Sequence, residues 1–566
     1  MRNRILFIIT VIFFTWSCTT NQKTKEVLKV AGPNRAELEK ILTQYSEDES
    51  YSIHLEAARY LINNMPGHYA YDTTGLSTYR PVVEKIYELR NSGVSVNNIK
   101  EQVNPLMDDL NLKYPLYQFY SNTQNDLNYI TAEGLKNHID LAVKSYDNNP
   151  FKDSIAFEDF LEYVAPYRIL DGKSVEDWRS YFIQNHAEYL DQDYNTLHQL
   201  CDSLLYNYYK IEIGWDIATR FPYVKFEDYL KSRMALCPQK TWFNCMLLRS
   251  FGIPATIDYN PVSRLHEVGH EWNAIKLKSG THPFEAFWGG GNIWHLKKLY
   301  GRESMHDMLG IVEFPKIYRK TYKMNVTELL EHTIKTEEEI PTFFQNPFQL
   351  DVSEEYFKTY PVETPVLKEI EDHNYVYACV MGANQAWVPV EFGKIKRGKT
   401  LFRNMGSNNV YLPCNYEFGS IEPASYPVFL NDEGKSIILE PDTIKRISLH
   451  AAHVAYPEPW IAVLQKCLVG ARVEVSNDKD FKTCRVLYEI KEPYDLYPNY
   501  VSLPDDASKY RYIRFTIPDV NLGRLHEIKF FNNSSGIEEE IRGKLISSFP
   551  DDIPLLQKIV DKVVVT

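Results

Sequence analysis

Residues 235–255 read ALCPQKTWFNCMLLRSFGIPA, and this stretch predicts the secondary structure at the middle of the chain. Proline is favoured at the first position of a helix and glycine just after the last one. Pro238 and Gly252 therefore predict a helix between them. The β-rich residues 253–259 and the alternating residues 271–277 predict strands after it.

A cysteine directly before the first helical residue is well placed to react. At the N-cap, Cys237 would face backbone N–H groups and the positive end of the helix dipole. These groups stabilise a thiolate and can hold an oxyanion. A buried structural role is the commoner fate of a cysteine, and Cys245, inside the helix, is interpreted in that way. Cys237 is therefore the candidate nucleophile.

Further stretches follow Cys237 in a recognisable order: LRSFGIPA at 248–255, GHEWN at 269–273 and PFE at 283–285. This order resembles the transglutaminase-like superfamily, which shares the Cys-His-Asp logic of papain. The resemblance is closest to exported transglutaminase-domain proteins of Bacteroides-type bacteria. Weaker parts of it lie at AGPNRAELEKIL (31–42) and NMPGHY (64–69).

The resemblance implies a role for each of three residues. Cys237 matches the nucleophile, His270 matches the base in its H-x-W context, and Glu285 stands where the third member, usually aspartate, is expected. A carboxylate there would orient the imidazole and stabilise the imidazolium. The chain departs from the family at Ala235-Leu236, where Gly-Asp is frequent, and at Glu285, which is one methylene longer than Asp. The alternative for His270 is a hydrogen-bonded histidine of a strand.

A competing motif overlaps this site, because residues 266–270 read HEVGH. On a helix this pattern would bind zinc, with Glu267 as the base and Glu285 as a conceivable third ligand. Pro261 just upstream and the glycine inside the motif disfavour a helix. The residues that follow alternate like a strand, and Asn273 stands where a metzincin needs glycine. Zinc therefore remains a second alternative.

Length and composition describe a soluble multidomain chain. It has 566 residues, of which 44% are hydrophobic and 24% charged, which is ordinary for globular proteins. The formal net charge is −13, without a long basic run. Nucleic-acid binding requires clustered Lys and Arg, so this class of function is not expected.

The N-terminus has the pattern of an export signal. Arg2 and Arg4 precede an apolar run from Ile5 to Phe14 that is too short to span a bilayer. Ser17-Cys18 then resembles the lipobox of a bacterial lipoprotein. The resemblance implies a signal peptide at 1–17, a lipidated Cys18 with a polar tether up to residue 32, and a place in the cell envelope as an outer-membrane lipoprotein. A plain signal peptide or a retained anchor is the alternative.

The eight cysteines do not suggest a disulfide framework. Apart from Cys18 they stand at positions 201, 237, 245, 379, 414, 467 and 484. They include no CxxC pair, so a cysteine zinc site is not indicated either. Seven is an odd number, so at least one thiol stays free, and a free thiol in an oxidising compartment is a candidate nucleophile.

The expected fold class is α+β multidomain, with a helical N-terminal region, a papain/transglutaminase-like core and C-terminal β-sandwich domains. Asn34 and Glu37 suggest a capping box at the first helix. VGARVEVSNDKDF, YRYIRFTIP and GRLHEIKFF, between 469 and 531, resemble part of a discoidin or galactose-binding-like jelly roll. The expected divisions are a helical region at 33–220, the core at 221–315, a linker at 316–355, a β-sandwich at 356–460, the galactose-binding-like domain at 461–536 and a tail at 537–566.

The leading hypothesis is an exported thiol hydrolase or acyltransferase acting on amide bonds of peptides or glycopeptides. No cofactor is expected, and the membrane would be reached through the lipid anchor. The alternative from another class is a non-catalytic surface lipoprotein that binds glycan or peptide. In that case the core would be an inactive scaffold and the β-domains would hold the ligand.

Overall fold

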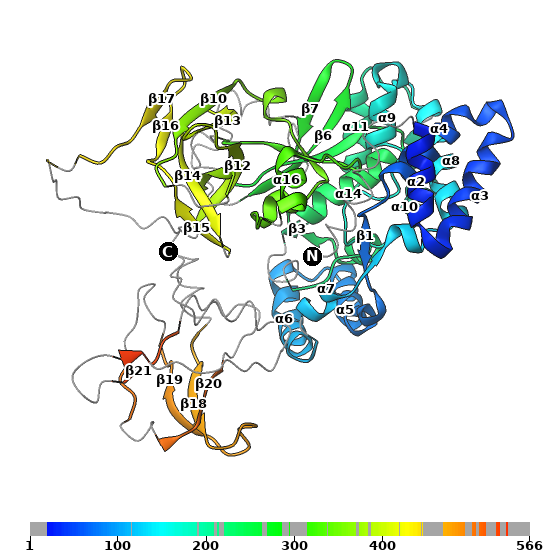
Figure 1. The fold of residues 1–566 in the computed structure, drawn as a ribbon. Helices are drawn as coiled ribbons and strands as arrows, with labels where there is room; N and C mark the ends of the chain where they lie inside the picture. The colour runs from blue at the N-terminus through cyan, green and yellow to red at the C-terminus, as the bar shows by residue number, and fades with distance from the viewer. Residues whose placement is uncertain are drawn as a thin grey trace. The chain divides into compact units, whose positions relative to one another are not determined.

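The computed structural model describes much of the chain in two compact units (Figure 1). One unit holds residues 1–382 and 387–441, and the other holds 383–386 and 442–566. The described residues are 20–114, 116–189, 192–208, 212–213, 220–262, 269–285, 294, 314–336, 338–368, 373–382, 386–417, 419–442, 444, 468–492, 501–504, 509–516, 528–532 and 539–540. The predicted signal peptide and Cys18 lie outside them, as does most of the predicted tail.

Helices dominate the first part of the larger unit, as the sequence predicts (blue to cyan in Figure 1). Apolar residues recur on one face of each longer helix and share one core. The helices are α2 (Thr20–Val30), α3 (Arg35–Ser46), α4 (Ser52–Asn64), α5 (Arg80–Asn91), α6 (Val96–Lys113), α7 (Leu116–Ser121), α8 (Ala132–Asn148), α9 (Phe157–Tyr163), α10 (Trp178–His186), α11 (Leu197–Tyr206) and α13 (Phe226–Ser232).

The tether expected up to residue 32 is, from Thr20 onward, a packed helix. Val27 and Leu28 of α2 are buried, and Lys23 Nζ donates to Asn64 Oδ1 of α4 at 3.3 Å. The segment is mainly polar, but its few apolar residues recur at helical spacing on one face. Such a face is enough to pack a surface helix against its neighbours. The tether prediction is therefore wrong for this part of the chain.

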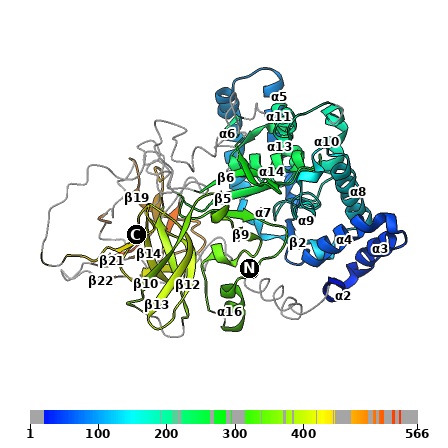
Figure 2. The same cartoon turned by 90° about the horizontal axis from the view of Figure 1, so that it is seen from above.

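A five-stranded antiparallel sheet follows the helices, in the order β7-β6-β5-β8-β9. Its strands are β5 (Ala255–Asn260), β6 (His270–Leu277), β7 (Gly280–Phe284), β8 (Tyr318–Lys320) and β9 (Gln349–Asp351). The predicted helix is α14 (Cys237–Arg249), which packs on β5 and β6 (Figure 2). All ten of its residues from Lys240 to Arg249 are buried, because α10 and α11 pack against it as well.

The segment 316–355, predicted as a linker, is part of this architecture. It supplies β8 and β9 to the sheet of β5 and β6 and contributes a further helix, α16 (Glu328–Thr336). Lys316 Nζ, fully buried, donates to Asp351 Oδ2 at 2.5 Å. Strands of three residues are too short to show a period of two in the sequence, which explains the wrong prediction.

The rest of the larger unit is all-β, as predicted. A two-stranded sheet of β10 (Thr359–Pro365) and β13 (Lys399–Gly406) shares an apolar core with a six-stranded sheet. The six-stranded sheet is formed by β12 (Trp387–Lys394), β11 (Tyr375–Met381), β14 (Asn409–Glu417), β16 (Val428–Leu430) and β17 (Ser436–Ile438), with β15 (Ser420–Pro423) on β14.

The smaller unit is described only in part. Its strands β18 (Arg472–Ser476), β19 (Arg485–Glu489) and β20 (Tyr512–Thr516) form an antiparallel sheet in the order β19-β18-β20. The short strands β21 (Phe531–Asn532) and β22 (Glu539–Glu540) pair with each other. Among the described helices of the whole chain, none has both the length and the apolar character needed to cross a bilayer.

Candidate active site

Cys237 is the first residue of α14, and extended Leu236 is the N-cap. The prediction placed Cys237 one position earlier, at the N-cap itself. Pro238 occupies the second helical position, where the backbone N–H that proline lacks would have no partner within the helix. Cys237 is half-buried, so the residue at the start of the first turn can still be reached from solvent.

His270 opens strand β6 and is held there by its backbone. Its N–H donates to Asn260 Oδ1 at 3.1 Å, and the two residues face each other in the β5–β6 register. Gly269 precedes it, where a Cβ atom would lie 2.9 Å from the carbonyl oxygens of both Asn260 and Pro261. The glycine in GHEWN is therefore a steric requirement of the position from which His270 starts.

The ring of His270 connects the thiol to a carboxylate. Its Nε2 lies 2.6 Å from Glu285 Oε1, and the Cys237 thiol is its second hydrogen-bonding partner. Glu285 directly follows β7 and is only 3% exposed, whereas the His270 side chain is 34% exposed. The structure thus brings together the three residues that the sequence singled out.

The electrostatics of this group favour a charged histidine. Burial by itself lowers the pKa of His270, but its hydrogen bonds with Cys237 and Glu285 and the charges of both groups raise it to about 10. Near neutral pH the imidazole is therefore a cation. A cation beside a thiol favours the thiolate, and a buried carboxylate on the far side stabilises the imidazolium.

Asn273 fixes the strand of His270 onto the helix of Cys237. Its Nδ2 donates to the carbonyl oxygens of Thr241 at 2.9 Å and of Thr256 at 3.1 Å, and its Oδ1 accepts from Asn244 Nδ2 at 2.9 Å. Thr241 and Asn244 belong to α14, and Thr256 belongs to β5. This role could not be predicted from the sequence, although Asn273 is the last letter of GHEWN.

A second buried network supports the other face of the strand. Trp272 Nε1 donates to Tyr356 Oη at 3.1 Å, and that hydroxyl donates to Asp258 Oδ2. Asp258 also accepts from Arg319 Nε at 2.8 Å and from Arg319 Nη2 at 2.7 Å. Asp258 and Arg319 are almost fully buried. The network therefore joins β5, β6 and β8, and the Trp272 ring centroid lies 6.0 Å from that of His270.

Other cysteines have surroundings that suit a packing role. Cys245 of α14 is fully buried, and burial raises the pKa of its thiol to about 12. Burial also raises the pKa of Cys201 well above the ordinary value. A thiol in such surroundings stays protonated and inert. Cys18 and Cys467 lie outside the described residues.

The one histidine of the zinc motif that the structure describes, His270, lies on a strand. His270 begins β6 and does not continue a helix, while His266 and Glu267 lie outside the described residues. Within the described ranges, no group of three or more His, Cys, Asp or Glu side chains could hold a metal ion. His270 instead pairs with Glu285, as described above.

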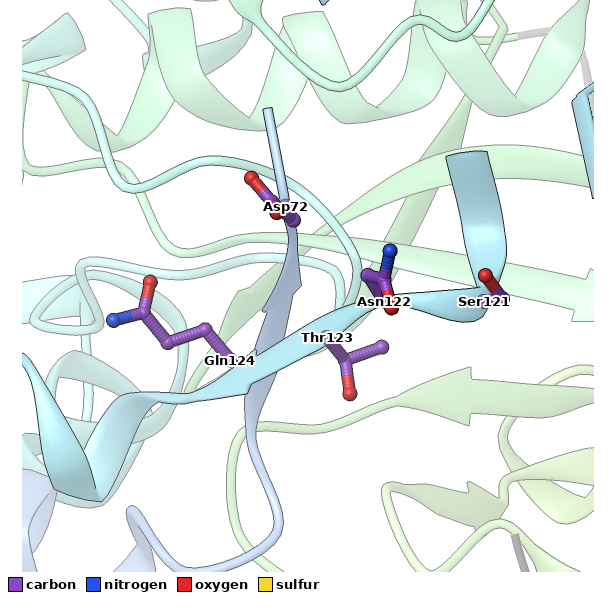
Figure 3. Close-up of a pocket in the computed structure, with 5 residues that line it drawn as sticks. All are labelled: Asp72, Ser121, Asn122, Thr123 and Gln124. Atoms are coloured by element: carbon purple, nitrogen blue, oxygen red, sulfur yellow. The ribbon is translucent and has the colours of Figure 1, made fainter. Parts of the chain in front are cut away.

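A shallow hollow lies elsewhere, between the end of β1 (Tyr69–Tyr71) and β2 (Thr123–Asn125). It is lined by Asp72, Ser121, Asn122, Thr123 and Gln124. Figure 3 shows these side chains pointing in different directions, so they offer no common point to one ligand atom. The hollow therefore carries no chemistry comparable with that of Cys237.

Replacing Glu285 by glutamine is expected to change how stability depends on pH. A pKa that rises from the ordinary 6.5 to about 10 on folding stabilises the folded chain fully below about pH 6.5. This stabilisation is lost as the pH rises through about 10. Urea unfolding of wild type and Glu285→Gln should therefore differ most near pH 6 and least near pH 10. A difference that stays constant over this range would contradict the assignment.

Comparisons with known proteins add no relative to this description. The chain matches no protein-family model, no curated protein and no solved structure. The residues and their geometry are therefore the whole basis for assigning a function.

Proposed function

We propose that the chain is an exported thiol hydrolase or acyltransferase of the transglutaminase-like, papain type, which acts on amide bonds of peptides or glycopeptides. One observation carries the proposal: the Glu285 carboxylate lies 2.6 Å from Nε2 of His270, and the Cys237 thiol interacts with the same imidazole ring. A nucleophile, a base and an acid that orients the base are the parts that acyl transfer requires.

Each residue has one task in the proposed reaction. The Cys237 thiolate attacks the amide carbonyl carbon, and the carbonyl π electrons move onto the oxygen. Protonated His270 then gives its proton to the leaving amine as the C–N bond breaks, which leaves a thioester. His270 next takes a proton from water, whose oxygen attacks the thioester. The sulfur then departs as a thiolate beside the protonated ring, which releases the carboxylic acid product and restores the starting ion pair. Glu285 orients the ring and stabilises its cationic form.

Hydrolysis is favoured over cross-linking in this proposal, because water is the default acceptor outside the cell. A primary amine that reaches the thioester before water would give the transfer product. Both outcomes share the same acyl-enzyme and require the same three residues. The function is therefore proposed at the level of amide acyl transfer.

The experiment compares the wild-type chain with Cys237→Ala on a tryptic peptide mixture, with and without dansylcadaverine. The wild type is expected to give new peptide termini or dansylated products, which mass spectrometry identifies. Cys237→Ala should give neither, because no thioester can form. Unchanged product formation by Cys237→Ala would rule out the mechanism, and Cys245→Ala serves as a control for replacing a cysteine of the same helix.

In the alternative in which the core is an inactive scaffold, one reason to expect inactivity is that Glu285 is one methylene longer than the usual aspartate. Its Oε1 lies 2.6 Å from His270 Nε2, so the extra methylene gives no reason to expect an inactive site. Export, lipidation of Cys18 and sugar binding by the smaller unit remain proposals that rest on sequence resemblance. A glycan array with the full chain would test the last of these.

A further inference from the structure

A group of charged side chains begins one helical turn along α14 from the nucleophile. Thr241 follows Cys237 by four residues, so the two side chains share one face of the helix. Thr241 Oγ1 lies 3.0 Å from Cys237 O and 3.4 Å from Glu271 Oε2. Glu271 belongs to β6 and forms an ion pair with Lys320 of β8. The group therefore touches both elements that carry the reacting residues, α14 and β6.

Lys173 approaches this group from the segment before α10. Its Nζ donates to Tyr223 O and lies over the ring of Trp242 of α14, 4.7 Å from the ring centroid. Both contacts suit an ammonium group, because a carbonyl oxygen and an aromatic face each carry partial negative charge. The charges of Lys320 and Glu271 act on the same ammonium group. Lys173 is thus held beside α14, next to the ion pair of β6 and β8.

Lys173 has no acidic partner of its own. Within the ranges that the structure describes, no carboxylate forms an ion pair with its Nζ, and Glu271 is paired with Lys320. Burial and the charge of Lys320 lower the pKa of Lys173 to about 8, although Glu271 acts to raise it. The ammonium group is therefore mostly charged near neutral pH. Lys173 is also partly exposed, so an anion from solvent can reach a charge that the protein itself leaves without a counter-ion.

We propose that Lys173 determines specificity, because its ammonium group binds a carboxylate of the substrate while Cys237 attacks the amide. The carboxylate belongs either to an acidic side chain or to the C-terminus of a peptide, and the chemistry of recognition is the same. The inference rests on the proposed function and names its substrate class, which is peptides with a free carboxylate near the scissile amide.

The reach of a peptide suits this arrangement. One turn of α14, from Cys237 to the start of the charged group, advances about 5.4 Å along the helix axis. An extended peptide advances about 3.3 Å per residue. A carboxylate within a few residues of the amide can therefore reach Lys173. With two lysines and one glutamate, the group carries an excess of positive charge, which favours an anionic ligand over a neutral one.

Two alkylating reagents test this charge without a known substrate. Iodoacetate and iodoacetamide both form a thioether with Cys237 Sγ as iodide leaves, and only iodoacetate carries a carboxylate. The ratio of the two rates at Cys237, mapped by mass spectrometry, reports how strongly the surroundings attract a carboxylate. The His270 cation contributes to this ratio in every variant, so each variant is compared with the wild type.

Lys173→Met keeps a side chain of similar length and removes the charge. We expect the ratio of the iodoacetate rate to the iodoacetamide rate to fall at least about threefold, with the iodoacetamide rate changed by less than about twofold. Lys173→Arg keeps the charge and should keep the ratio. An unchanged ratio in Lys173→Met would overturn the proposal.

A variant with the opposite effect covers the case in which Lys173→Met does not fold. Glu271→Gln removes the negative charge that faces Lys173 and Lys320, so the ratio should rise at least about twofold. A ratio that does not rise would overturn the proposal as well.

The matched control is Lys278→Met. Lys278 is exposed, follows β6 at the end opposite His270, and donates from Nζ to Asp153 O at 2.9 Å, a carbonyl contact like that of Lys173. Its loss changes the net charge of the chain by the same amount and should leave both rates at Cys237 unchanged. An equal fall of the ratio in both lysine variants would show an effect of net charge and would overturn the proposal.

Peptide turnover distinguishes the two sources of the carboxylate. The wild type is given synthetic peptides with or without glutamate, each with a free or an amidated C-terminus. A requirement for glutamate assigns the acidic side chain, and a requirement for the free C-terminus assigns the terminal carboxylate. Equal turnover of peptides that have neither would overturn the proposal. If iodoacetamide does not label wild-type Cys237 selectively, the proposed function itself fails. If it does, but the ratio is insensitive to Lys173, only the present inference fails.

Discussion

Replacing His270 by alanine is expected to slow acylation of Cys237 by p-nitrophenyl acetate about 100-fold near neutral pH. The imidazole interacts directly with the thiol, and the raised pKa of the imidazole makes it a cation under these conditions. Without that cation the thiolate loses its counter-charge. Alanine also removes the group that exchanges protons with the reacting thiol and the leaving group.

The control for this variant is His282→Ala. His282 lies on β7, the strand that ends next to Glu285, and is half-buried like His270. Its ring contacts Ser279 Oγ and the ring of His198, so its loss should not change acylation. A similar decrease in both variants would show that the rate follows the folding of the sheet and not the chemistry of His270.

Replacing Asp258 by asparagine is expected to cost about 3 kcal/mol in the free energy of unfolding. Removing one partner of a buried ion pair leaves the other charge in the protein interior without compensation. Arg319 is 1% exposed, and its remaining polar contacts would be with Thr281 Oγ1 and with the partly exposed Glu355. Tyr356 would lose a charged acceptor as well. Urea unfolding of the full chain measures the change.

An exposed ion pair of the same unit is the matched comparison. Lys399 Nζ and Glu363 Oε1 are 2.9 Å apart, and both side chains are 61% exposed. Glu363→Gln should cost less than about 0.5 kcal/mol, because solvent already screens both charges. If the two variants cost the same, the Asp258–Arg319 ion pair does not stabilise the sheet that carries His270.

The sequence predicted those elements whose end residues or apolar periodicity are visible within the element itself. The helix after Cys237 is recognisable from Pro238 and Gly252, and the alternation at 271–277 corresponds to β6. Gly252 has a φ of +70° and lies against Ser145 and Tyr146 of α8, so its place after the helix is also a packing requirement. The helix itself ends at Arg249, within the usual uncertainty of a helix boundary.

Patterns that depend on distant contacts were not predicted. The capping box expected from Asn34 and Glu37 is absent, because both side chains bond to the segment around α8. Asn34 Nδ2 donates to Leu127 O and Ile130 O, and Glu37 Oε2 accepts from Ala132 N–H. The pairing of β5 with β8 is likewise invisible in the sequence, since Asp258 and Arg319 are 61 positions apart.

Some residues of the candidate site could be predicted from the sequence, and others could not. Cys237, His270 and Glu285 could be proposed because their order and the letters around them resemble a family. Asn273 could not, because its role depends on which backbone carbonyl groups its carboxamide meets after folding.

Selective reactivity of Cys237 in the wild-type chain tests the central claim most directly. The chain would be treated with limiting iodoacetamide near pH 6.5, and the labelled cysteines would be mapped by mass spectrometry. Cys484, which is exposed, is the internal comparison. The account predicts that Cys237 reacts at least about tenfold faster than Cys484, because His270 supplies a neighbouring cation. A rate for Cys237 equal to or below that of Cys484 would contradict a catalytic thiol at this site.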